Sequence, residues 1–129
     1  MTSARLAFSS AQVAGLLGVS DRRVRTMLHA RELAHVTIGS RLVVLDGDVF
    51  HDPETDGRAN LRMAWRGRRA VPVAEVAEGV GVSVRALARL AKGGQFPLRQ
   101  VRGRWVADRD RLVRWLLARR RPSRAEIGR

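Results

Sequence analysis

The chain has 129 residues and a formal net charge of +13 at pH 7, with 25 Lys and Arg residues against 12 Asp and Glu. This length fits one ordinary domain or two very small ones, and all basic residues except Lys92 are arginine, which favours nucleic acid over membrane as an anionic partner. The lack of cysteine excludes disulfides and thiolate zinc sites, and no apolar run approaches the roughly 20 residues that span a bilayer, so we expect a cytoplasmic protein.

Residues 10–28, SAQVAGLLGVSDRRVRTML, have the pattern of two short helices joined by a tight turn. The first helix ends at Gly18, because glycine adopts the left-handed backbone that a helix end needs. Ser20 is the expected N-cap of the second helix. The apolar side of the first helix is expected to consist of Val13, Leu16 and Leu17.

The second helix, which follows Ser20, has two different faces. The apolar face can pack against the first helix, and the polar face is then free to contact a ligand. This is the layout of a DNA-binding helix-turn-helix. The apolar face consists of Val24, Met27 and Leu28, and the polar face of Arg22, Thr26 and His29.

The same pattern recurs 63 residues later along the chain. Residues 8–51 align with residues 71–114 without a gap, and nine of the 44 positions are identical. The identities fall where the pattern needs them, with a small residue where the two helices approach and a glycine at their turn. The identical pairs are Ala11/Ala74, Val13/Val76, Ala14/Ala77, Gly18/Gly81, Val19/Val82, Ser20/Ser83, Arg22/Arg85, Arg41/Arg104 and Val43/Val106.

A strand-turn-strand pattern follows each helix pair, and we interpret both hairpins as wings. Gly39 and Ser40 suit a tight type II′ turn in the first copy, and Gly103 supplies the positive φ of the turn in the second. An arginine follows each turn, where a wing would meet the DNA backbone. The expected strands are residues 34–38 and 41–45, then residues 98–101 and 104–107, and the arginines are Arg41 and Arg104.

Each copy is expected to close with a helix. The first, residues 46–51, is short, and Asp46 and Asp48 lie in its first turn, where the helix dipole stabilises a negative charge. The second, residues 108–121, is longer and ends before Pro122. Its apolar stripe consists of Leu112, Trp115 and Leu116.

Two segments lie outside the repeated copies. In the linker, residues 59–65 are expected to be helical, and the arginines after them form either a solvated connection or a minor-groove arm. The basic tail, residues 119–129, is expected to be frayed. The side chains available for packing in the linker are Leu61, Met63, Ala64 and Trp65, and the arginines are Arg66, Arg68 and Arg69.

Together these patterns predict an α+β fold, mainly α with small β-hairpin wings. The expected organisation is a module over residues 1–52, a linker over 53–70, a second module over 71–121 and a basic tail over 122–129. Residues 8–51, with the phrase AQVAGLLGVSDRRVRTMLHARELAHVTIGSRLVVLDGDV, resemble the excisionase/MerR-like winged helix-turn-helix family, and residues 71–116 look like the same module.

The resemblance implies that the second helix of each module enters the major groove of DNA while the wing touches an adjacent minor groove or the backbone. The second module has Ala86 and Ala88 where the first has Arg23 and Arg25, so we expect the first to supply more specificity and the second more electrostatic affinity. The candidate DNA-binding residues are Arg22, Arg23, Thr26, His29, Arg41, Arg85, Arg89, Lys92, Arg102 and Arg104.

The resemblance implies double-stranded DNA as the partner and leaves three roles open. The first is a monomer-capable transcription regulator that reads an asymmetric two-part site through helices in successive major grooves. The second is an excisionase-type recombination directionality factor that works with an integrase. The third is a DNA-binding antitoxin, which would dock its toxin on residues 59–65 or on the apolar face near Trp115.

No pattern predicts enzymatic chemistry or a cofactor. The three histidines, His29, His35 and His51, lack the spacing of metal ligands. No glycine-rich phosphate loop or nucleophile motif is present. We therefore expect a binding protein that needs neither a metal nor a cofactor and is not an enzyme.

Overall fold

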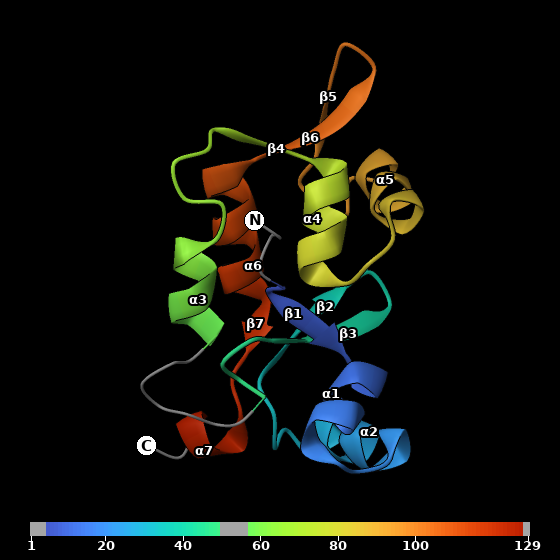
Figure 1. Cartoon of the computed structure of the whole chain (residues 1–129), viewed down its shortest axis with the longest axis vertical. Helices are drawn as coiled ribbons and strands as arrows, with labels where there is room; N and C mark the ends of the chain where they lie inside the picture. Colours follow the sequence, from blue (N-terminus) through green and yellow to red (C-terminus); the bar gives the residue numbers. More distant parts are fainter. Residues whose placement is uncertain (1–4, 50–56, 128–129) are drawn as a thin grey trace.

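The computed structural model describes residues 5–49 and 57–127, which form seven helices and two antiparallel sheets. The α+β class predicted from the sequence is thereby confirmed. Two helix pairs lie along one side of the elongated molecule, and other helices lie along the opposite side (Figure 1). The helices are α1 (Ser10–Leu17), α2 (Asp21–His29), α3 (Gly57–Met63), α4 (Val73–Val80), α5 (Val84–Lys92), α6 (Arg109–Arg119) and α7 (Arg124–Ile127).

The strands form one four-stranded sheet, in the order β1-β3-β2-β7, and one three-stranded sheet, in the order β4-β6-β5. All neighbouring strands in both sheets are antiparallel. The strands are β1 (Ala7–Ser9), β2 (His35–Ile38), β3 (Arg41–Leu45), β4 (Ala70–Pro72), β5 (Arg99–Val101), β6 (Arg104–Asp108) and β7 (Arg120–Arg121).

The second half of the chain repeats the first in the order strand, helix, helix, strand, strand. Each of these five elements ends 63 residues after its counterpart in the first half. The strand register is repeated as well, since Ala7 faces Leu45 in β1–β3 and Ala70 faces Asp108 in β4–β6. We call β1, α1, α2, β2 and β3 the first repeat, and β4, α4, α5, β5 and β6 the second repeat.

The helix boundaries follow the local signals that recur at this offset. Gly18 and Gly81 both adopt the left-handed backbone, with φ of 69° and 74°, and end α1 and α4. The Oγ atoms of Ser20 and Ser83 each accept a hydrogen bond from the backbone N–H three residues on, at 3.0 and 3.1 Å. The predicted turn and the predicted N-cap at Ser20 are therefore confirmed.

The two hairpin turns differ in their backbone. In the first, Gly39 has a φ of +64° and Ser40 has a negative φ. This is the combination that a type II′ turn requires. In the second, both Arg102 and Gly103 have positive φ, at 51° and 78°, the combination of a type I′ turn. The predicted positive φ at Gly103 is confirmed, and Arg102 has a positive φ as well, because a type I′ turn places both central residues in that region.

The segments that follow each hairpin differ from the sequence prediction. Residues 46–49 form a turn and not the start of a helix, while residues 50–51 lie outside the described residues. Helix α6 ends at Arg119, and the chain then forms β7 and α7, so the tail is not frayed up to residue 127. In the linker, α3 begins and ends two residues earlier than the predicted helix over residues 59–65. Trp65, which was predicted to be helical, lies after α3 and has a φ of +52°.

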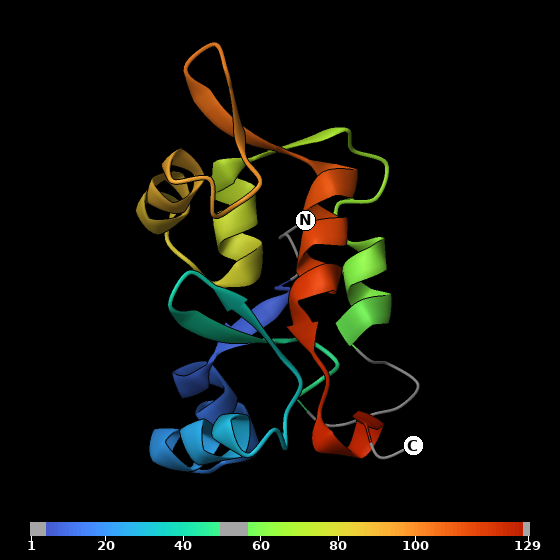
Figure 2. The same ribbon diagram turned by 180° about the vertical axis from the view of Figure 1, so that it is seen from behind.

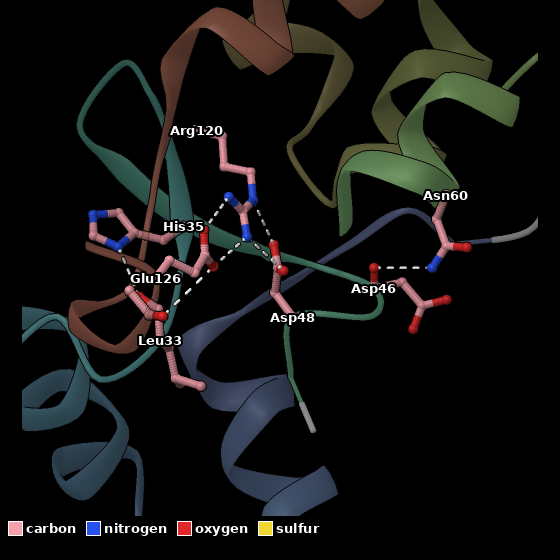
Figure 3. A network of polar contacts seen from close by, with 8 residues as sticks. Leu33, His35, Asp46, Asp48, Asn60, Arg120 and Glu126 are labelled. Carbon is pink, nitrogen blue, oxygen red and sulfur yellow. Dashed lines mark hydrogen bonds and ion pairs between the residues drawn. The ribbon is translucent and has the colours of Figure 1, made fainter. Parts of the chain in front are cut away.

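A buried ion cluster explains why the tail is ordered (Figure 3). The Arg120 guanidinium donates to Asp48 at 2.9 and 3.1 Å and to Glu126 at 2.7 and 2.9 Å. The side chains of Arg120 and Asp48 are 3% and 4% exposed. Asp48 is therefore a buried partner of Arg120 and not a first-turn residue of an exposed helix.

One hydrophobic core receives side chains from both repeats. It joins Val36 and Leu45 of the first sheet to Leu87 of α5, and α3 and α6 cover it with Leu61 and Leu112. A second cluster lies between α1, α2 and β3. Two residues predicted to pack are mainly on the surface, Leu16 at 46% and Met63 at 56% exposure.

Candidate nucleic-acid interface

Helix α2 presents a polar face to solvent because its opposite face is in the core. Val24 and Leu28 are buried and Met27 is half-buried, which orients the helix on α1. The packing face predicted from the sequence is thus confirmed. All four candidate residues of this helix are exposed, namely Arg22, Arg23, Thr26 and His29.

Two arginines of α2 have acidic neighbours on the surface. Arg25 Nη2 lies 2.6 Å from Asp21 Oδ2, and Arg23 Nη2 lies 4.0 Å from Glu32 Oε2. Exposed pairs of this kind contribute little to stability, so an arginine can exchange its carboxylate for a phosphate or a base edge at small cost. Within residues 5–49 and 57–127, Arg22 forms no ion pair and is available to a ligand as it stands.

Helix α5 carries the equivalent face in the second repeat. Leu87 is fully buried, and Ala86, the counterpart of Arg23, is also buried, so this helix has no cationic side chain at the position of Arg23. None of the basic residues on its outer face forms an ion pair with another described residue. The exposed candidates on this helix are Arg85, Arg89 and Lys92.

The hairpin β5–β6 projects beyond the body of the molecule at one end (Figures 1 and 2). Strand β5 is exposed along its whole length. Arg102 lies in the turn and Arg104 begins β6, and both are exposed. This hairpin has the free tip that a wing requires.

The hairpin β2–β3, in contrast, has its tip against the second repeat. Two methyl carbons of Leu90 on α5 lie 3.0 and 3.1 Å from the position that a Cβ would take at Gly39. Arg41, which begins β3, remains exposed. The first hairpin therefore connects the two repeats and still offers an arginine at the surface.

The candidate residues lie on consecutive elements along one side of the molecule. Both views show α2 and α5 on the same side, with the tip of β2–β3 between them and α3 and α6 on the opposite side (Figures 1 and 2). The fold thus places two helices that bear exposed basic residues, 63 residues apart in the chain, along the same side of the molecule.

The sequence prediction missed the arginines at the end of α6. Arg119 lies over the ring of Trp115, with 4.1 Å between the guanidinium carbon and the ring centre, and Arg120 forms the buried cluster. The available signal was the run of three arginines immediately before Pro122 and after an apolar helix stripe.

No group of three or more metal-binding side chains is found among the described residues. Within the same ranges, no helix has both the length and the apolar character needed to cross a bilayer. Comparisons with protein families, curated proteins and solved structures found no match to this chain.

Proposed function

We propose that this protein binds double-stranded DNA as two winged helix-turn-helix units held in one body. Helices α2 and α5 act as recognition helices in successive major grooves, with Arg22 and Arg85 as their common contacts. The observation that carries the proposal is the exposure of basic residues on two helices that lie along the same side of the molecule. The net charge of +13 supplies the electrostatic attraction to phosphate.

The contacts between the repeats support a site of fixed geometry. Strand β7, which follows the second repeat, pairs with β2 of the first. The backbone N–H of Leu6 donates to the carbonyl of Gly79 at 2.8 Å, and Gly39 contacts Leu90. Because these contacts join the repeats on several sides, the two half-sites are read at one spacing, about 10 base pairs apart.

The preferred site is asymmetric because the two recognition helices differ. Arg23 and Arg25 of α2 have alanine counterparts in α5. A monomer that reads two different half-sites suits a transcription regulator. An excisionase-type directionality factor and a DNA-binding antitoxin would use the same DNA-binding step, and they would differ from the regulator by requiring an integrase or a toxin.

The test is selection of bound duplexes from a random pool with the full chain, followed by footprinting. The variant Arg22→Ala/Arg85→Ala should weaken binding to the selected site by about tenfold or more, since a bidentate arginine–guanine contact is worth about 1–3 kcal/mol. A matched control, Arg62→Ala/Arg111→Ala, removes the same charge from exposed positions of α3 and α6.

Equal losses in the variant and the control would show that α2 and α5 are not the recognition helices. A palindromic footprint that needs two chains would contradict the two-part monomeric site. Binding to RNA in preference to duplex DNA would exclude the proposed function.

A further inference from the structure

A groove of about 750 Å³ lies where the end of α6, strand β2 and the loop after α5 meet. We call it the junction groove, because both repeats contribute to its walls. Strands β7 and β2 run side by side next to it (Figure 2). The residues that line the groove include Thr37, Gly39, Gln95, Trp115, Arg119 and Arg121.

One wall of the junction groove is an open strand edge. Strand β7 pairs with β2 only at His35 and Val36, so the outer edge of β2 beyond Val36 has no neighbouring strand among the described residues. Thr37 lies on this open part and lines the groove. An open edge offers backbone N–H and C=O groups in the spacing that an extended peptide matches. The open part consists of Thr37 and Ile38, so an added strand would pair with β2 over these two residues.

The junction groove is cationic. Arg119 and Arg121 are exposed, no lining residue is acidic, and neither arginine forms an ion pair within residues 5–49 and 57–127. The Arg119 guanidinium is stacked on Trp115, whose ring meets Phe96 edge-on with 5.0 Å between the ring centres. Stacking holds the guanidinium plane while its N–H groups stay free to donate to a carboxylate.

We propose that the junction groove binds an extended acidic peptide segment of a partner protein. The segment adds to the open edge of β2 and places carboxylates on Arg119 and Arg121. A DNA strand suits the groove less well, because its sugar-phosphate backbone has no hydrogen-bond donor for the carbonyl groups of a strand edge. The proposal depends on the groove alone and stands whether or not the protein binds DNA.

The test measures binding of a short fluorescent peptide of alternating glutamate and valine to the full chain without DNA. Loss of both arginines in Arg119→Ala/Arg121→Ala should weaken binding by about tenfold or more, because each charge-assisted hydrogen bond is stronger than a neutral one. The control Arg62→Ala/Arg111→Ala loses the same charge elsewhere and should change binding by less than about twofold. A peptide with proline at alternate positions should also bind weakly, since it lacks the N–H donors of a strand.

Chemical shift mapping with the ¹⁵N-labelled chain locates the bound peptide. Shifts concentrated at Thr37, Gly39, Gln95 and the Trp115 indole would support the proposal. Shifts concentrated on α2 and α5 would overturn it, since the peptide would then only mimic DNA. Equal weakening of peptide binding in the groove variant and the control would also overturn it.

Discussion

The Arg120 guanidinium forms two hydrogen bonds with the Asp48 carboxylate, at 2.9 and 3.1 Å, across 72 residues of the chain. Asp48 follows the last strand of the first repeat, whereas Arg120 follows α6, the helix after the second repeat. Glu126 completes the cluster from the other side of the guanidinium. This cluster joins the C-terminal segment to the first repeat.

Replacement of Arg120 by methionine should destabilise the fold by about 3–5 kcal/mol, because removing one member of a buried ion pair leaves the other charge uncompensated. Urea unfolding followed by circular dichroism measures this loss. Arg121→Met is the matched control, since Arg121 is the exposed neighbour in the same strand. Equal effects of the two substitutions would show that the Asp48 contact does not stabilise the fold.

The stability of the fold should fall in acid through Glu126. The hydrogen bond from Arg120 holds the pKa of Glu126 below its ordinary value, although partial burial acts in the opposite direction. A carboxyl group with a lowered folded-state pKa stabilises the fold above its ordinary pKa, and this contribution is lost as the pH falls through the folded-state pKa.

Glu126→Gln should therefore be less stable than the parent chain at neutral pH and approach it in acid. Urea unfolding at several pH values measures the difference. Glu32→Gln is the control, because Glu32 has an exposed partner at 4.0 Å. A difference between Glu126→Gln and the parent that does not change with pH would contradict the role assigned to this carboxylate.

The contact between the first hairpin and α5 can be measured by a double-mutant cycle. Gly39→Ala should cost about 1–2 kcal/mol from the left-handed backbone alone, and more because the new Cβ meets Leu90. In the Leu90→Ala background the cost of Gly39→Ala should fall by about 0.5 kcal/mol or more. Additive effects in urea unfolding would mean that the hairpin tip and α5 are not coupled.

The fixed arrangement of the repeats should make DNA binding sensitive to half-site spacing. Insertion of about 10 base pairs, one full turn, between the selected half-sites restores their rotational phase but separates them by a further turn. A chain with flexibly linked modules tolerates this insertion, whereas this protein should bind it no better than a single half-site. Gel-shift titrations that show full affinity for the inserted site would contradict the rigid arrangement.

Helices α2 and α5, the proposed recognition helices, should differ in what they contribute to DNA binding. Arg22→Ala and Arg23→Ala in α2 should alter the sequence preference at particular base pairs. Arg89→Ala in α5 should weaken binding to all DNA sequences similarly and reduce the salt dependence of the affinity. Competition titrations at several salt concentrations distinguish these effects. A change of sequence preference with Arg89→Ala and a uniform loss with Arg22→Ala would reverse the assignment.

The sequence alone determined the features that depend on neighbouring residues. A left-handed glycine ends a helix wherever the flanking residues are helical, and a serine caps the next helix with its own hydroxyl, so Gly18 and Ser20 could be assigned without tertiary information. The offset of 63 between the repeats was also visible in the sequence, whereas strands β1 and β4, which pair with β3 and β6, were not predicted from it.

Only the tertiary structure decided which residues from distant segments meet. The local sequence of Arg120 indicates only a basic tail, and the buried contact with Asp48 appears only in the tertiary structure. Leu16 and Val13 were both predicted to pack, but Val13 is fully buried whereas Leu16 is 46% exposed. The open edge of β2 beside Arg119 likewise exists only because β7 stops after two residues. Burial and ion pairing depend on what the rest of the chain places against a residue, and that information is absent from its local sequence.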